Sequence, residues 1–438
     1  MASEIRVNKI THTAGVGTIT TNADGIVVAG IVTANNFSGA VTGSGANLTS
    51  IPAGQLTGTV ADARLSTVSS SKLSGALPAL DGSALTGVGA SFGNSSVNTS
   101  GIITATSFVP TTGQLSHRNI VVNGDMRIAQ RGTSSTSSGI YSVDRFGVWY
   151  HGTNEAPTQA QVDVSSGTTP YTNGFRKALK ITNGNQTGGA GATDWVWVRY
   201  LFEAQDIANS GWNYTSSSSY VTLSFWIKSS VAQTFKGYLR SRDGTEQRYA
   251  FETGSLTADT WTKIVKTIPG NSNLQFDNDA NQGFQLNILG FMGTDYTDSS
   301  VTEDVWAAYA SGTRMKDNTS TWYTTNDATL EITGFQLEVG PEATAFEHLS
   351  YGEELRLCQR YYQGATSVGA GYGSADGYAR AGSVYAVVMR ASPTLTTTNT
   401  ASGSIIASGT SGSGFYVTYG SLGGSSAGIF TFAADAEL

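Results

Sequence analysis

The stretch F335QLEVGPEATAFEHLSYGEELRLCQRYY362 marks a change in the character of the chain. It begins as a strand, because Phe335, Leu337 and Val339 alternate with polar residues and place one apolar face on a sheet. Gly340-Pro341 then ends the strand, since proline lacks a backbone donor. A helix is predicted from Ser350 to Tyr362, with Ser350 as its cap and an acidic residue three positions later. The stretch therefore closes one domain and leads into another.

Alternation of apolar and polar residues recurs upstream and predicts an all-β domain over residues 118–349. The runs lie at 175–182, 195–202, 220–228, 235–240, 261–268, 284–289 and 330–339. Turn signals at Asn183-Gly184, Asp243-Gly244 and Pro269-Gly270 separate several of them. Seven or more such strands indicate a two-sheet antiparallel sandwich. Residues 363–438 are poor in charge, and runs at 384–389, 415–420 and 429–433 predict a small distal β-domain.

The first 117 residues have a different composition, with no Trp and no Tyr, whereas all eight tryptophans lie between Trp149 and Trp322. Leucines recur there at spacings of 8, 9, 8 and 12 within Gly/Ser/Thr-rich runs. We expect a β-repeat shaft over 33–117, formed by three chains around one axis because one chain buries too little apolar surface. The alternative is an unstructured linker, which the composition by itself favours. The leucines in question are Leu48, Leu56, Leu65, Leu73 and Leu85.

Composition also excludes several classes of function. The net charge is −7 and Lys and Arg are scattered singly, so that nucleic acid is not expected as a partner. Cys358 is the only cysteine, which excludes an intrachain disulfide and a cysteine-rich zinc site; we expect a small apolar helix residue. No run approaches the ~20 apolar residues of a membrane span, and no signal peptide precedes the first strands. We expect synthesis in the cytoplasm of a host, no membrane insertion, no cofactor and no metal.

Four motifs occur in order: R118NIVVNGDMRIAQRG132, the closing strand G334FQLEVG340, Y351GEELRLCQRYY362 and M389RASPT394. In this combination the chain resembles the distal part of bacteriophage tail fibre proteins of the marine and cyanophage type. The NGDM opening and the final GFQLE strand resemble the jelly-roll sandwich of carbohydrate-binding modules. The resemblance implies a virion component: a homotrimeric tail fibre docked through residues 1–32 to tail or baseplate proteins. It implies contact with a host, and the Gly/Ser/Tyr-rich composition of residues 363–438 leads us to expect that this end binds a host polysaccharide or outer-membrane receptor.

Candidate binding residues come from two regions. Trp226 lies on the polar side of its strand, as do Tyr238 and Arg240 on the next, and together they could stack on a sugar and hydrogen-bond its hydroxyls. The same residues could instead pack against loops or a neighbouring chain. In the distal domain, Gly/Ser-rich loops and strands carry tyrosines suited to contact a ligand. These are Tyr372, Tyr378, Tyr416 and Tyr419.

Three further patterns leave alternatives open. Trp195, Trp197 and Arg199 share one side of a strand, where a tryptophan pair more often packs than binds. The loop D277NDANQG283 departs from a calcium loop at two positions, so that a solvated turn is expected. No hydrolase, zinc-protease or nucleotide motif occurs, and we expect no enzyme, although a polysaccharide depolymerase or a purely structural neck or head fibre stays possible.

Overall fold

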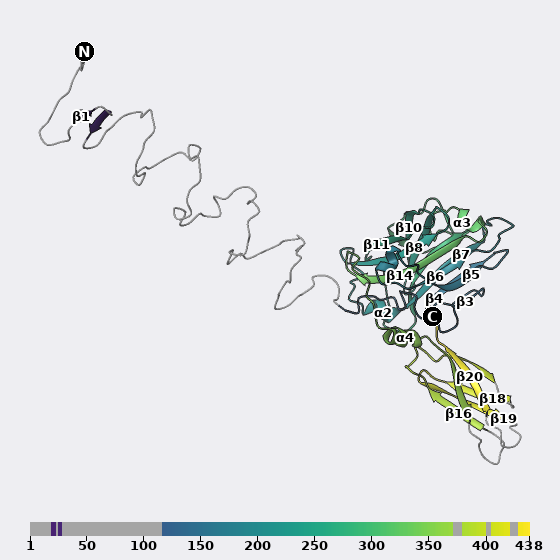
Figure 1. Cartoon of the computed structure of the whole chain (residues 1–438). Coiled ribbons are helices and arrows are strands. Elements are labelled where there is room, and N and C mark those ends of the chain that lie inside the picture. The colour runs from purple at the N-terminus through teal and green to yellow at the C-terminus, as the bar shows by residue number, and fades with distance from the viewer. Residues whose placement is uncertain (1–18, 23–24, 29–115, 371–378, 400–403, 421–427) are drawn as a thin grey trace. The chain divides into compact units, whose positions relative to one another are not determined.

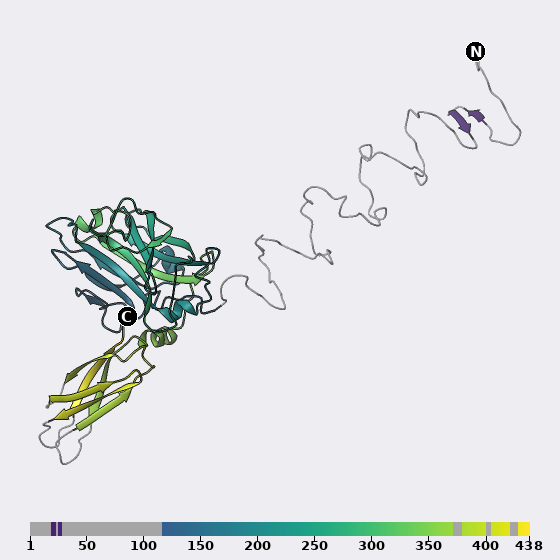
Figure 2. The same ribbon diagram turned by 180° about the vertical axis from the view of Figure 1, so that it is seen from behind.

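The computed structural model describes residues 19–22, 25–28, 116–370, 379–399, 404–420 and 428–438. The chain divides into two units, Met1–Ile102 and Ile103–Leu438. In the first unit, strands β1 (Ile19–Asn22) and β2 (Gly25–Val28) pair as an antiparallel hairpin, drawn as two arrows in Figure 2. The shaft predicted for residues 33–117 lies outside the described residues except for its last two, so that it stays a prediction.

The second unit contains two six-stranded antiparallel sheets, which we call sheet I and sheet II (Figure 1). Sheet I has the order β13 (Trp306–Ala308), β10 (Gln247–Ser255), β9 (Thr234–Ser241), β12 (Gln282–Met292), β7 (Trp195–Glu203) and β4 (Phe146–His151). Sheet II has the order β11 (Thr262–Pro269), β8 (Tyr220–Ser229), β14 (Thr329–Val339), β6 (Lys177–Thr182), β5 (Thr158–Asp163) and β3 (Ser134–Ser135). Short helices α1 (Thr169–Thr172), α2 (Ala204–Ala208) and α3 (Thr321–Thr324) lie in the connections.

One core fills the space between the sheets because each strand turns every second side chain inward. Val196 and Val198 of β7 and Leu223 and Phe225 of β8 are at most 2% exposed and belong to the same cluster. Phe225 also stacks on Phe335 of β14, with ring centroids 4.6 Å apart. The predicted two-sheet sandwich is confirmed, and all seven predicted strands form within it.

The predicted helix is also confirmed, although it is shorter than expected. Helix α4 spans Tyr351–Gln359, and Tyr362 already begins strand β15. Ser350 accepts a hydrogen bond from the Glu353 amide at 3.3 Å, and the Glu353 carboxylate accepts from the Ser350 amide at 3.0 Å, so that the capping box is complete. Cys358 is fully buried on this helix, as expected of a small apolar side chain, and burial raises its pKa.

Residues 362–438 form a small β-domain of two three-stranded sheets. Their orders are β15 (Tyr362–Ala370), β20 (Gly428–Asp435), β17 (Thr394–Asn399), and β16 (Ala379–Val384), β19 (Gly414–Gly420), β18 (Ser404–Thr410). The strand predicted at 384–389 is wrong, since β16 ends where that run begins. The Gln363 side chain accepts a hydrogen bond from the Ala386 amide and donates one to the Val387 carbonyl. These side-chain hydrogen bonds take the place of backbone pairing with another strand at these two residues.

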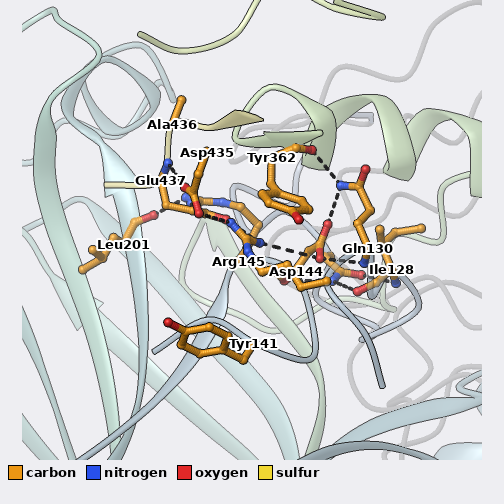
Figure 3. Close-up of polar contacts among 12 residues, drawn as sticks. Ile128, Gln130, Tyr141, Asp144, Arg145, Leu201, Tyr362, Asp435, Ala436 and Glu437 are labelled. Atoms are coloured by element: carbon orange, nitrogen blue, oxygen red, sulfur yellow. Dashed lines mark hydrogen bonds and ion pairs between the residues drawn. The ribbon is translucent and has the colours of Figure 1, made fainter. Parts of the chain in front are cut away.

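Two of the motif segments, 118–132 and 351–362, meet where the sandwich joins helix α4 and the small β-domain, since Gln130 donates to the Tyr362 carbonyl at 2.8 Å (Figure 3). Arg145 is 1% exposed; its guanidinium pairs with the Glu437 carboxylate and lies 3.4 Å from the Tyr361 ring centroid. Arg131 lies 3.7 Å over the Tyr362 ring. These contacts fasten Arg131 of the amino-terminal motif, and Arg145 beyond it, to residues more than 200 positions later.

The other motif segments contribute to the same junction. Arg360 donates twice to the buried Glu203 carboxylate, each time at 2.7 Å. Arg390 donates to the Ala436 carbonyl at 2.8 Å. Gly124 packs so closely on strand β14 that a Cβ would lie 2.1 Å from a backbone oxygen of that strand. The motif residues that carry the family resemblance therefore hold the parts of this unit together.

Candidate functional site

The outer face of sheet I carries a row of aromatic side chains. Strand pairing places Trp149 of β4 opposite Trp197 of β7, and His151 opposite Trp195. Trp195 stacks on Trp197 with centroids 4.5 Å apart and an angle of 21°, and His151 stacks on Trp195 at 5.7 Å. Because the inner side of these strands is occupied by valines of the core, all four rings point away from it.

The rings of this row differ in how much they expose. Trp197 is 4% exposed, Trp149 and Trp195 are half-buried, and His151 is exposed. The buried Trp197 ring therefore packs against Trp195 and holds it in place, whereas the Trp149 and Trp195 rings are partly exposed to solvent. An indole held by stacking presents a rigid apolar area of the kind on which a flat ligand ring packs.

Arginines flank the same row. The Arg199 guanidinium lies 4.6 Å from the Trp197 ring centroid and 5.6 Å from that of Trp149. Arg314, in the segment after β13, lies 5.5 Å from the Trp197 centroid and 4.5 Å from that of Tyr296. Burial lowers the pKa of Arg199, and the nearby Arg314 charge acts in the same direction. We call Trp149, His151, Trp195, Trp197, Tyr296, Arg199 and Arg314 the indole-arginine face.

The predicted grouping of Trp226 with Tyr238 and Arg240 is wrong. Trp226 lies on β8 of sheet II, whereas Tyr238 and Arg240 lie on β9 of sheet I, and each points outward from its own sheet. Tyr238 is moreover only 1% exposed, because it packs in a buried cluster with Val301, which follows β12, and Met315, which follows β13. Two outer faces on opposite sides of the sandwich cannot form one binding surface.

Trp226 and Arg240 are each engaged in local packing. Trp226 is half-buried beside Phe175 and Phe346 and lines a pocket of about 190 Å³ on sheet II. Arg240 lies 3.4 Å from the Tyr309 ring centroid, and its Nε donates to Glu246 at 3.0 Å. Both residues can still contact a ligand, but they would do so at separate places.

The tyrosines predicted in the distal domain divide into three groups. Tyr416 of β19 is 56% exposed, and its ring lies across Gly409 of β18, where a Cβ would come within 2.4 Å of it. Tyr419 belongs to the same strand, but its side chain is not among those described. Tyr372 and Tyr378 lie outside the described residues. Tyr416 is thus an open aromatic platform, and the roles of the other three stay predictions.

A pocket of about 460 Å³ opens beside helices α2 and α4 and is lined in part by residues 117–122. One of its lining groups is Glu354, 5% exposed, whose pKa burial raises to about 7 against the opposing hydrogen bond from the Asn123 amide. This carboxyl group accepts the hydrogen bond from the Asn123 amide and so links helix α4 to the amino-terminal motif of the sandwich.

The acidic loop predicted as a solvated turn is engaged internally, with the Asp279 carboxylate accepting from the Asn281 amide at 2.9 Å. Within residues 116–370 and the other described segments, no group of three His, Cys, Asp or Glu is placed to hold a metal. No helix in the described part of the chain is long and apolar enough to cross a membrane.

Sequence reasoning found the shared side of Trp195, Trp197 and Arg199 but missed their companions. The alternation in F146GVWYH151 carries a signal for Trp149 and His151, since both fall on one side of a strand. Arg314 and Tyr296 lie in irregular segments, where no periodicity marks their direction.

No family model matches the chain, and no curated protein matches it. Solved structures with similarity include the enzymatically active domain of tailspike protein 4 from bacteriophage CBA120, at 10% identity and TM-score 0.27, covering 51% of this chain and 21% of that one. The amino-terminal cellulose-binding domain of Cellulomonas fimi β-1,4-glucanase C has 12% identity and TM-score 0.24, covering 50% and 99%. A family 11 carbohydrate-binding module from Clostridium thermocellum has 11% identity and TM-score 0.22, covering 49% and 98%. Similarities at these scores do not establish a function.

Proposed function

We propose that this chain is a glycan-binding protein and that the indole-arginine face of sheet I is its binding surface. The observation that carries the proposal is the pair of half-buried indoles, Trp149 and Trp195, held in place by the buried Trp197. Stacking of a pyranose on such a ring buries apolar C–H surface, and adjacent guanidinium donors can hydrogen-bond the ring hydroxyls. The open position of the rings suits a polymer lying along the sheet.

Substitution of single indoles tests the proposal. Trp195→Ala and Trp149→Ala should each weaken binding to a glycan found on an array by roughly ten- to hundredfold, as loss of a ring contact worth ~1.5–3 kcal/mol implies. Trp226→Ala is the matched control, because it removes a half-buried indole from the outer face of sheet II. Thermal unfolding would check that each variant folds. If Trp226→Ala abolished binding and Trp195→Ala did not, the site would lie on sheet II.

The biological setting we propose is that of a phage tail fibre in the virion, with the first 32 residues bound to tail or baseplate proteins. The support is the order of the four motifs and the contacts that Arg131, Arg360 and Arg390 of these motifs make at the junction. We propose a homotrimer that adheres to a host surface without cleaving it. Light scattering of the full chain tests the trimer. Release of reducing ends from a bound polysaccharide would instead favour a depolymerase, and failure to bind any host surface would favour a structural fibre.

The distal domain offers a second candidate surface. Tyr416 is 56% exposed, and Val384 and Ile406 of the same sheet are 80% and 54% exposed. A protein receptor or a glycan could pack on this apolar area. Tyr416→Ala in the full chain, assayed by adsorption to host cells beside Trp195→Ala, would show which of the two surfaces holds the host.

A further inference from the structure

The outer face of sheet I collects arginines that are far apart in the sequence. Arg199, Arg240 and Arg248 lie on β7, β9 and β10, and strand pairing places Arg240 directly opposite Arg248. Arg314 joins them from the segment after β13 by its contact with Trp197, over which Arg199 also lies. All four guanidinium groups thus belong to one side of one sheet.

Most of this positive charge has no carboxylate partner. Only Arg240 forms an ion pair among the four in the part of the chain that the structure describes, and its partner is Glu246. The Arg199 Nε donates to the neutral Asn287 side chain at 3.3 Å. Arg248 is 6% exposed, yet its Nε and Nη1 have no hydrogen-bond acceptor among the described residues, and neither does the buried Nε of Arg314.

Such an arrangement is costly in the free protein. A buried donor without an acceptor costs ~1–3 kcal/mol, and more when it is charged. The pKa of Arg199 is lowered first by burial and further by the nearby charges of Arg314 and Arg240. A bound anion would remove both costs. The chain as a whole carries a net charge of −7, so that general attraction of anions does not explain the cluster.

We propose that the glycan held by the indole-arginine face is an acidic polysaccharide, with carboxylate or sulfate groups on its sugars. This deepens the proposed function and rests on it. The planar fork of arginine matches two oxygens of a carboxylate or sulfate group in a bidentate pair. Arg199 and Arg314 receive the acidic group while a neighbouring sugar ring stacks on Trp195 or Trp149. Neutral glycans fit the indoles and offer the guanidinium groups hydroxyl acceptors, but they leave the positive charge without a counter-charge.

The test compares polymers that differ only in charge. Polygalacturonate, its methyl ester, dextran sulfate and unmodified dextran would be titrated against the full chain by calorimetry or affinity electrophoresis. We expect tighter binding of polygalacturonate than of its ester, or of dextran sulfate than of dextran, by at least tenfold. Binding should weaken as salt rises, because exposed parts of the ion pairs are screened. Equal affinity for both members of each pair would overturn the inference.

Two arginine variants sharpen the test. Arg199→Gln and Arg314→Gln should each reduce affinity for the acidic polymer roughly ten- to hundredfold, as hydrogen bonds to charged groups imply. Each should weaken binding of the neutral polymer or ester by much less, because a hydroxyl group makes only a neutral hydrogen bond with the guanidinium group. Arg176→Gln is the control, since it makes the same change in charge at an exposed arginine beside Tyr171 and away from this face. Equal losses in all three variants would overturn the assignment of the site.

The outcomes separate the two levels of the proposal. Binding of neutral glycans alone, abolished by Trp195→Ala, would overturn the acidic ligand and keep glycan binding. Binding of no glycan of either kind would overturn both. Single-stranded DNA serves as a non-sugar polyanion, and affinity for it equal to that for polygalacturonate would show that charge alone is recognised, which also contradicts the inference.

Discussion

Loss of one carboxylate near the end of the sequence should destabilise the sandwich. Glu437 pairs with Arg145, whose guanidinium is 1% exposed beneath strand β7 and the Tyr361 ring. Glu437→Gln removes the opposing charge and leaves this cation buried against the Leu201 carbonyl and the rings of Tyr361 and Tyr200. Breaking a buried pair in this way costs ~3–5 kcal/mol. Because those partners offset a part of the loss, we expect the free energy of unfolding to fall by ~3 kcal/mol.

Asp435 provides a matched control two residues away. Its carboxylate pairs with Arg131 at 2.9 Å, but the Asp435 side chain is 45% exposed. Asp435→Asn makes the same change in charge and should cost at most ~1 kcal/mol.

Urea unfolding followed by tryptophan fluorescence measures both variants, since all eight tryptophans lie in the sandwich sequence between Trp149 and Trp322. The double variant Arg145→Met/Glu437→Gln should recover part of the stability, because no unpaired charge remains. Equal small effects of Glu437→Gln and Asp435→Asn would refute the idea that the buried pair joins the two parts.

Two more predictions concern the same junction. Burial raises the pKa of Glu354 to about 7, so that the folded chain binds more protons than the unfolded chain between about pH 4.5 and 7. The free energy of unfolding should therefore fall as pH rises through 7, and this group contributes on the order of 2 kcal/mol to the fall. Glu354→Gln should make the free energy of unfolding depend less on pH in denaturation experiments from pH 5 to 8. The same pH dependence in the variant and the parent chain would contradict this prediction. Gly124→Ala should lower stability by ~1–3 kcal/mol in thermal unfolding, because its Cβ would meet the Phe335 carbonyl oxygen at 2.1 Å. Gly352→Ala, where a Cβ meets nothing within 4 Å, should be neutral or stabilising, and equal losses in both would contradict the steric reason.

Alternation in the sequence predicted the strands because each lies between core and surface and shows its burial pattern directly. It also gave the correct side for Tyr238, which points away from the core as expected. It could not tell that the chain crosses from sheet II to sheet I between Trp226 and Tyr238, since a link of that length fits a hairpin equally well. Nor could it show that Val301 and Met315 cover Tyr238 from a segment without periodicity.

The arginine cluster shows a second reason why the site escaped prediction. The sequence contains no run of basic residues, so that it does not signal a positively charged site. Antiparallel strand pairing nevertheless brings the arginines at positions 199, 240, 248 and 314 to one face of sheet I. Charge patterning along a chain reports only local density, whereas binding depends on density in space.

The residues that signal the family resemblance and the residues proposed to bind are two different sets. Asn123, Arg131, Arg360 and Arg390 of the motifs are engaged with backbone carbonyls, carboxylates or rings at the junction. The indole-arginine face contains none of them. A junction requires the same donors and acceptors whatever the ligand, because its partners are parts of the same chain. A binding face can change with the ligand at little cost to the fold, since its side chains point away from the core. Chains that share these motifs should therefore share the joint between sandwich and distal domain, whereas the side chains on the outer face of sheet I are free to differ among them.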